Sequence, residues 1–261
     1  MFFQLYFFGC IGQAFSTSDS TEGDKIVSEL EEIPSSGPSS HWPSKVRLSA
    51  LGSSEHRGIF YVDYLLPLYY SQDHTTLLFF NPKQNYSTPS AQETNLGVGL
   101  RQIFFDKFIL GAHFFYDKKL AHSDKLYSQI GGGFEFLSQP FDFRFNYYDP
   151  VTKAKVTDDS YEFGSTSLIH VNNMEEPLGG FDFELGFPIP AKQLKTRLYF
   201  GGFFFNSKLG KDVNGYKIRS ETDLTNWFAV DLALNSRNAG EAEFIGGVRF
   251  TIPIELGRVL S

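Results

Sequence analysis

The sequence predicts an all-β fold, a transmembrane antiparallel β-barrel of about twelve strands. Apolar and polar residues alternate with a period of two in one segment after another, as they do when the two faces of a strand meet different surroundings. The segments run to about 10–13 residues, close to the length that a tilted strand needs to cross a bilayer. Aromatic residues also gather near the segment ends, where membrane barrels carry their girdles.

The alternation is clearest in FDFRFNYYDP, residues 141–150. A slip of one residue would turn every side chain to the other face and place Arg144 in lipid, at a cost of about 2–4 kcal/mol at the midplane. The register is therefore strongly fixed. One side of this segment carries Phe141, Phe143, Phe145 and Tyr147, and the other carries Asp142, Arg144 and Asn146.

Twelve segments follow this pattern, and single-chain bacterial barrels have an even number of strands. Short turns such as FFDK, SQP and PIPAKQ alternate with longer connections such as KKLAHSD and 150–177, and short turns of such barrels face the periplasm. Within the longest connection, YEFGSTSLIHV is expected to extend a hairpin above the membrane. The expected strands are 45–52, 58–70, 75–82, 92–104, 107–117, 125–138, 141–149, 178–188, 194–206, 214–224, 226–235 and 241–253.

The two faces of these strands give two sets of candidate residues. The apolar set is expected to face lipid: Phe108, Leu110, Phe114, Phe141, Phe143, Phe145, Phe181, Phe183, Leu185, Phe228, Val230, Leu232, Phe244, Val248, Phe250 and Ile252. The polar set is expected to face the lumen: Asp63, Arg101, His113, Asp117, Glu135, Asp142, Arg144, Asp182, Glu184, Asp231, Glu243 and Arg249.

A soluble antiparallel sandwich is the alternative, with the apolar face as its core and the polar face in water. Whole charges of both signs in mid-strand, together with glycines, favour a lumen lined by ion pairs. The triplet at 131–133 is expected to let a crowded wall bend or a plug approach closely. A barrel of this size needs something in its lumen: water, a loop or the N-terminal segment. As an open pore it would have acidic walls and favour cations.

Composition excludes several classes of protein. The 261 residues include 29 Phe, 13 Tyr and 24 Gly, and after residue 16 no apolar run reaches the roughly 18 residues of a membrane-spanning helix. The net charge of −7, with acids and bases interspersed, argues against a nucleic-acid partner. The single cysteine, Cys10, rules out an intrachain disulfide and any cysteine-rich metal site, and no cofactor is expected.

The N-terminus is expected to be a targeting segment. Residues 1–16 are apolar and end in Ala14-Phe15-Ser16, which places small residues at the −3 and −1 positions of a signal-peptidase site. The alternatives are a lipoprotein signal with Cys10 as the lipidated residue and a buried N-terminal strand. Residues 17–44 are interpreted as a periplasmic linker, with a short helix expected before Pro34. The barrel is expected over 45–254 and a C-terminal tail over 255–261.

Two stretches resemble the β-domain of inverse autotransporters, the intimin/invasin family. NLGVGLRQIFFDKFILGAHFFYDKKL is similar to that family's Gly-x-Gly-x-Arg strand, short turn and Leu-Gly-x-x-x-Phe-Tyr-Asp strand. EEPLGGFDFELGFPIPAKQLKTRLYFGGFF resembles its Glu-Arg-Pro…Gly-Phe-Asp strand, turn and return strand, with Glu176 and Pro177 in place and the Arg missing. The matching residues of the first stretch are Gly97, Gly99, Arg101, Leu110, Gly111, Phe115, Tyr116 and Asp117.

The resemblance implies a twelve-stranded barrel in the outer membrane of a Gram-negative-type bacterium, which exports an adhesive passenger and serves surface display. Only ELGRVLS follows Ile254, so no passenger is expected within this chain. The expected partners are outer-membrane lipid, the barrel-assembly machinery, and a passenger or surface ligand. The last strand carries Gly247, Phe250 and Ile252 in a spacing that resembles an assembly signal. A passive diffusion porin with the same fold is the alternative function.

A second alternative is an outer-membrane hydrolase. His122 and His170 fall in connections, and Asp158-Asp159 with a nearby His would form a proteolytic pair. A solvated acidic loop explains the same residues more simply. The sequence has no Gly-x-Ser-x-Gly, no phosphate-binding loop and no zinc-spaced histidine cluster. The chain is therefore not expected to be an enzyme.

Overall fold

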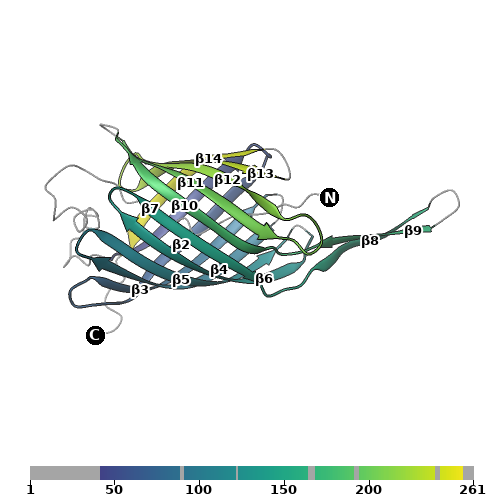
Figure 1. Cartoon of the computed structure of the whole chain (residues 1–261), viewed down its shortest axis with the longest axis horizontal. Helices are drawn as coiled ribbons and strands as arrows, with labels where there is room; N and C mark the ends of the chain where they lie inside the picture. Colours follow the sequence, from purple (N-terminus) through teal and green to yellow (C-terminus); the bar gives the residue numbers. More distant parts are fainter. Residues whose placement is uncertain are drawn as a thin grey trace.

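The computed structural model describes residues 42–254, apart from 89–90, 122, 164–167, 191–193 and 239–241, and without the side chains of 158–173. Twelve antiparallel strands close into one barrel, in the order β1-β14-β13-β12-β11-β10-β7-β6-β5-β4-β3-β2 (Figure 1). The predicted fold class and strand number are confirmed. The expected signal peptide, most of the linker and the tail lie outside the described residues. No helix in the described part of the chain is long and apolar enough to cross a membrane.

Fourteen strands occupy the described residues, and two of them form a separate hairpin. Most barrel strands begin and end within two or three residues of their expected bounds. The strands are β1 (Ser44–Ser53), β2 (Gly58–Tyr70), β3 (Thr76–Ser87), β4 (Ala91–Phe104), β5 (Phe108–Leu120), β6 (Leu126–Ser138), β7 (Asp142–Pro150), β8 (Lys155–Phe163), β9 (Leu168–Glu175), β10 (Gly179–Ile189), β11 (Lys195–Asn206), β12 (Val213–Asp223), β13 (Phe228–Arg237) and β14 (Glu243–Ile254).

Strand β3 ends at Ser87, so the predicted end at residue 82 was wrong. A proline has no N–H for the ladder, so Pro82 cannot donate a backbone hydrogen bond to a neighbouring strand. The pairing between β2 and β3 is instead interrupted around Pro82 and resumes on both sides of it. The side-chain amide of Asn81 donates a hydrogen bond to the carbonyl of Tyr64 in this gap. The strand therefore continues to Ser87.

The connections lie at two ends of the barrel. We call one the terminal end, because β1 begins and β14 ends there, and the other the hairpin end. FFDK and SQP lie at the terminal end and the long connection lies at the hairpin end, as predicted, but the lengths do not alternate throughout, since 54–57 and 88–90 at the hairpin end are shorter than 71–75 at the terminal end. In that connection β8 and β9 pair as a two-stranded sheet, which extends away from the barrel wall (Figure 1). The expected hairpin over YEFGSTSLIHV is therefore present.

Hydrogen bonds fix the base of this hairpin to the barrel. The Glu176 carboxylate accepts from the Ser207 hydroxyl at 2.5 Å and from the backbone N–H groups of Lys208 and Leu209, each at 2.9 Å. Glu175 accepts from Ser123 at 2.5 Å, and its carbonyl accepts from the Tyr127 hydroxyl at 3.2 Å. The acidic pair that precedes Pro177 thus ties β9 to the connections on both sides of it.

The outward face of the barrel is lined with aromatic rings that stack across strands. Phe104, Phe108, Phe136 and Phe141 form one ladder near the terminal end, with neighbouring ring centres 5.0–5.5 Å apart. Cross-strand aromatic pairs of this kind stabilise a sheet and fit the girdle of a membrane barrel. Farther round the barrel, Trp227 stacks on Phe250 at 6.0 Å.

Candidate functional site in the barrel lumen

Most of the buried charged side chains of the described residues lie in the lumen. Ten of the twelve polar candidates are buried, and His113 and Asp117 are half-buried, although all lie on strands of a single sheet. The sixteen apolar candidates lie on the opposite face, where each is half-buried or exposed. Because the wall is one layer thick, the buried face is the inner one, and its side chains cover one another across the lumen.

A row of register partners crosses the wall of β4, β5 and β6 and centres on a glycine. Arg101 lies beside Gly111, which lies beside Glu135. Arg101 donates from Nε to one Glu135 oxygen at 2.5 Å and from Nη2 to the other at 3.2 Å. A Cβ at Gly111 would overlap the Glu135 side chain. The glycine therefore lets two charged side chains meet across an intervening strand in a bidentate pair.

The glycines before Arg101 have the same role for aromatic rings. A Cβ at Gly97 would overlap the ring of Phe115, and a Cβ at Gly99 would overlap the ring of Phe79. The Arg101 guanidinium in turn lies 5.1 Å from the Phe79 ring centre. Large and small residues alternate from strand to strand, as in other filled barrels. The Gly-x-Gly-x-Arg pattern is thus a packing pattern of the lumen.

The glycine triplet of β6 continues this arrangement. Gly133 lies beside His113 on β5 and Asn146 on β7, and a Cβ there would overlap both side chains. His113 Nε2 and Asn146 Oδ1 are 3.1 Å apart and share a hydrogen bond. The crowded wall expected at 131–133 is therefore a place where side chains of neighbouring strands close over a glycine.

A second ion-pair network fills the lumen beside β10, β11 and β12. Glu184 accepts from Arg219 at 2.9 Å and from Lys217 at 3.1 Å. The Tyr199 ring, which is 1% exposed, lies beneath two guanidinium groups, Arg219 at 4.2 Å and Arg144 at 4.9 Å. Stacking on an aromatic face stabilises cations that are withdrawn from water.

Further ion pairs extend the network around the barrel. Arg197 Nη1 lies 2.8 Å from the Asp142 carboxylate, and Arg249 lies 3.2 Å from Asp231. Nearly every charge on the inner wall thus has a partner of opposite sign, which low-polarity surroundings require. Three more pairs belong to this network. Arg47 on β1 pairs with Asp63 on β2, and Arg57, in the connection between β1 and β2, pairs with Glu243 on β14. Arg219 and Glu221 pair within β12.

Several of these residues were not among the sequence-based candidates. Lys217, Arg219 and Glu221 alternate along β12, and this period of two was a signal that could have identified them. Arg47 on β1 and Arg197 on β11 each have one like charge two residues earlier, Lys45 and Lys195, and no charge in the strand after them. Their roles depend on partners in other strands, which a single sequence does not reveal.

An apolar layer closes the terminal end of the lumen on the side of β2 to β6. Trp42, from the segment interpreted as a linker, is 4% exposed and belongs to this layer. Its indole N–H donates to the carbonyl of His74 at 2.8 Å. The layer consists of Trp42, Leu65, Leu77, Phe79, Ile103, Ile109 and Leu137.

The turn that receives Trp42 is organised by Asp73. The Asp73 carboxylate accepts from the Ser71 hydroxyl at 2.5 Å and from the backbone N–H and hydroxyl of Thr75 at 3.2 and 3.1 Å. These hydrogen bonds, that of Ser71 foremost, hold the pKa of Asp73 below its ordinary value. The turn therefore keeps its charged acceptor at neutral pH.

The structure does not describe the side chains on which the hydrolase alternative depends. His122 and the side chains of Asp158, Asp159 and His170 lie outside the described residues. Among the side chains that are described, no three of His, Cys, Asp or Glu are grouped so that they could hold a metal ion.

The sequence matches the model of the family described as inverse autotransporter, beta-domain, over residues 45–222, which is more than half of the chain. A chain solved in a study of the in-meso crystallization of membrane proteins is similar in structure, with a TM-score of 0.60 and 18% identity over 82% of this chain and 86% of that one. The translocator domain of the autotransporter NalP from Neisseria meningitidis has a TM-score of 0.38 and 11% identity, over 88% and 92% of the two chains. No curated protein matches the sequence.

We expect the Arg101–Glu135 pair to be a strong stability determinant. Arg101→Met leaves Glu135 buried without its bidentate partner and should lower the free energy of unfolding by about 3–5 kcal/mol. Adding Glu135→Gln should recover most of that loss, because the uncompensated charge is gone. The measurement is urea unfolding of the barrel in lipid vesicles.

The matched control is Arg237→Met, which removes the pair with Glu55 at the rim (2.7 Å). Glu55 is about one-third exposed and also lies 3.3 Å from Arg57, so losing Arg237 should change stability by only about 0–1 kcal/mol. Equal effects of Arg101→Met and Arg237→Met would contradict the role given to the luminal pair, as would a double variant no more stable than Arg101→Met alone.

Proposed function

Because the chain belongs to the inverse autotransporter β-domain family, we propose that this outer-membrane barrel serves surface display or adhesion. In this role the barrel anchors a segment of polypeptide that faces the outside of the cell. The observation that carries the proposal, beside the family itself, is the filling of the lumen. Ion pairs and aromatic rings occupy its middle, and the layer around Trp42 occupies one side of its terminal end.

The proposed orientation places the hairpin end outside the cell. Short connections of such barrels face the periplasm and long ones face outward, and the longest connection here carries β8 and β9. The hydrogen bonds of Glu175 and Glu176 hold its base against the barrel. The hairpin would therefore be presented in a fixed direction, which suits contact with another surface or with a passenger.

The proposed partners follow from the two faces of the wall. Outward rings such as Phe114, Phe145 and Phe250 would contact outer-membrane lipid, and insertion would require the barrel-assembly machinery. A passenger or a surface ligand would be met at the hairpin end. The buried luminal chemistry is structural in this proposal, and no catalytic role is assigned to it.

A diffusion pore is the second candidate, and one observation favours it. Two cavities, of about 590 and 430 Å³ of empty space, lie among the side chains of β1 to β7. They share Lys83, His113, Phe115 and Asn146, so they adjoin at the Phe115 ring. A continuous path through both would conduct ions.

Planar-bilayer recording of the full-length chain, purified from outer membranes, separates the two functions. The display proposal predicts a folded barrel, shown by heat-modifiable gel migration, that gives no stable conductance steps. An open porin recorded in the same bilayers is the positive control. Stable steps from the heat-modifiable species would contradict the closed lumen and favour the pore.

Cysteine labelling on whole cells tests the display itself. Val156 on β8 is 39% exposed, so Val156→Cys should react with a membrane-impermeant maleimide on intact cells. Leu224→Cys, at the terminal end and 44% exposed, should react only after the outer membrane is broken. The unchanged chain, whose one cysteine is Cys10, gives the background. Labelling in the reverse order would overturn the orientation and the display role.

A further inference from the structure

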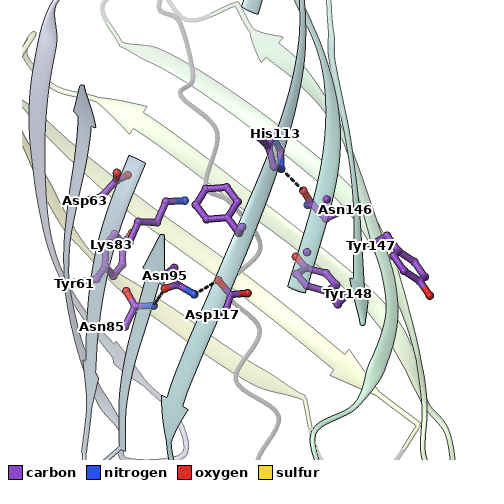
Figure 2. A pocket seen from close by; sticks show the side chains of 13 residues that line it. Tyr61, Asp63, Lys83, Asn85, Asn95, His113, Asp117, Asn146, Tyr147 and Tyr148 are labelled. Atoms are coloured by element: carbon purple, nitrogen blue, oxygen red, sulfur yellow. Dashed lines mark hydrogen bonds between the residues drawn. The ribbon is translucent and has the colours of Figure 1, made fainter. Parts of the chain in front are cut away.

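The larger luminal cavity lies in the half of the barrel nearer the hairpin end. Asn85 and Asp117 stand two and three residues before the hairpin-end limits of β3 and β5, and Tyr61 stands three residues after that of β2. A space that opens to solvent separates these side chains from those of β6 and β7, and its empty volume of about 590 Å³ includes the open part. Figure 2 shows Lys83, Asp117 and Tyr148 turned toward it, while Tyr147 points away from it.

One wall of the cavity is a chain of planar polar groups. The Asn95 amide donates to Asp117 at 2.7 Å and to Glu93 at 2.8 Å, and its oxygen accepts from Asn85 at 3.3 Å. Each group is thereby held in one orientation. In Figure 2 the second oxygen of Asp117 points away from Asn95 and toward the side of the cavity on which Tyr148 lies.

The opposite wall is a second chain of the same chemistry. Asn146 pairs with His113 at 3.1 Å and donates to Asp182 at 3.1 Å, and the Tyr148 hydroxyl donates to Asp182 at 2.9 Å. Between the walls lies the ring of Phe115, with the Lys83 ammonium 4.6 Å from its centre. The cavity thus combines fixed amide and carboxylate groups with an aromatic surface.

The charges of the lining are balanced. The lining carries the carboxylates of Asp63 and Asp117 and the ammonium of Lys83, and Asp63 also pairs with Arg47. A strongly anionic or cationic ligand would lack a net countercharge here. An uncharged molecule with many hydroxyl groups meets no such penalty, because amides donate to and accept from hydroxyl groups and carboxylates accept from them.

We propose that this cavity binds a neutral saccharide that enters from the hairpin end. The chain of Asn85, Asn95 and Asp117 would bind ring hydroxyls, and the edge of Phe115 together with Tyr148 would pack against the C–H face of the sugar. The site is independent of the display role, since it requires only the folded barrel and an accessible hairpin end.

Saturation-transfer NMR with methyl β-glucoside, methyl β-galactoside and lactose tests the proposal on the full-length chain, in a detergent without a sugar headgroup. At least one glycoside should receive saturation from the barrel and titrate to a plateau. Asn95→Leu, which removes the centre of the polar chain, should weaken that binding by about tenfold or more. Asn85→Ala is the second variant, for use if Asn95→Leu does not give a heat-modifiable barrel.

The matched control is Thr94→Val, because Thr94 is the neighbour of Asn95 that faces outward and is exposed. Its binding should stay within about twofold of the unchanged chain. The proposal is overturned if no glycoside binds, or if Asn95→Leu and Asn85→Ala bind as the unchanged chain does. It is equally overturned if galacturonate or spermidine binds in their place with dependence on Asn95.

Discussion

The compensation of charge inside the barrel is the constraint on which the rest of the structure depends. A one-layer wall has no second sheet to cover it, so each strand must turn its charges inward and an apolar face outward. An inward charge without a partner would cost several kcal/mol, and pairs such as Arg101–Glu135 and Arg219–Glu184 avoid that cost. Register, closure and strand order are thereby linked, since a slip in one strand would separate pairs made by its neighbours.

The period of two is a local signal that divides each strand into two faces, and in the structure the polar candidates lie on the inner one. It could not predict partners. Arg101 finds Glu135 two strands away only because Gly111 lies between them, and this meeting depends on the register of three strands. For the same reason Arg47 and Arg197 were missed. The length of β3 escaped prediction because the Asn81 side chain replaces a backbone donor beside Pro82.

The family pattern acquires a physical meaning from these contacts. Gly97 and Gly99 give room to two rings, and Arg101 closes over one of them, so the three residues act together to fill the lumen. A filled lumen suits a barrel that holds polypeptide at a surface better than one that passes solutes. Trp42 was assigned to a linker from composition alone, since nothing local marks a residue that packs against β2 to β6.

Spin-label accessibility along β7 tests the central claim most directly. Labels at Phe143 and Phe145, on the outward face, should be accessible to oxygen dissolved in lipid. A label at Asn146 should be less accessible to oxygen and to a water-soluble nickel complex, because that side chain is 6% exposed inside the barrel. Accessibility along β7 should therefore alternate with a period of two in lipid vesicles. Equal oxygen accessibility at successive residues, or higher accessibility at Asn146 than at Phe145, would contradict a wall with charges inside and aromatic rings in lipid.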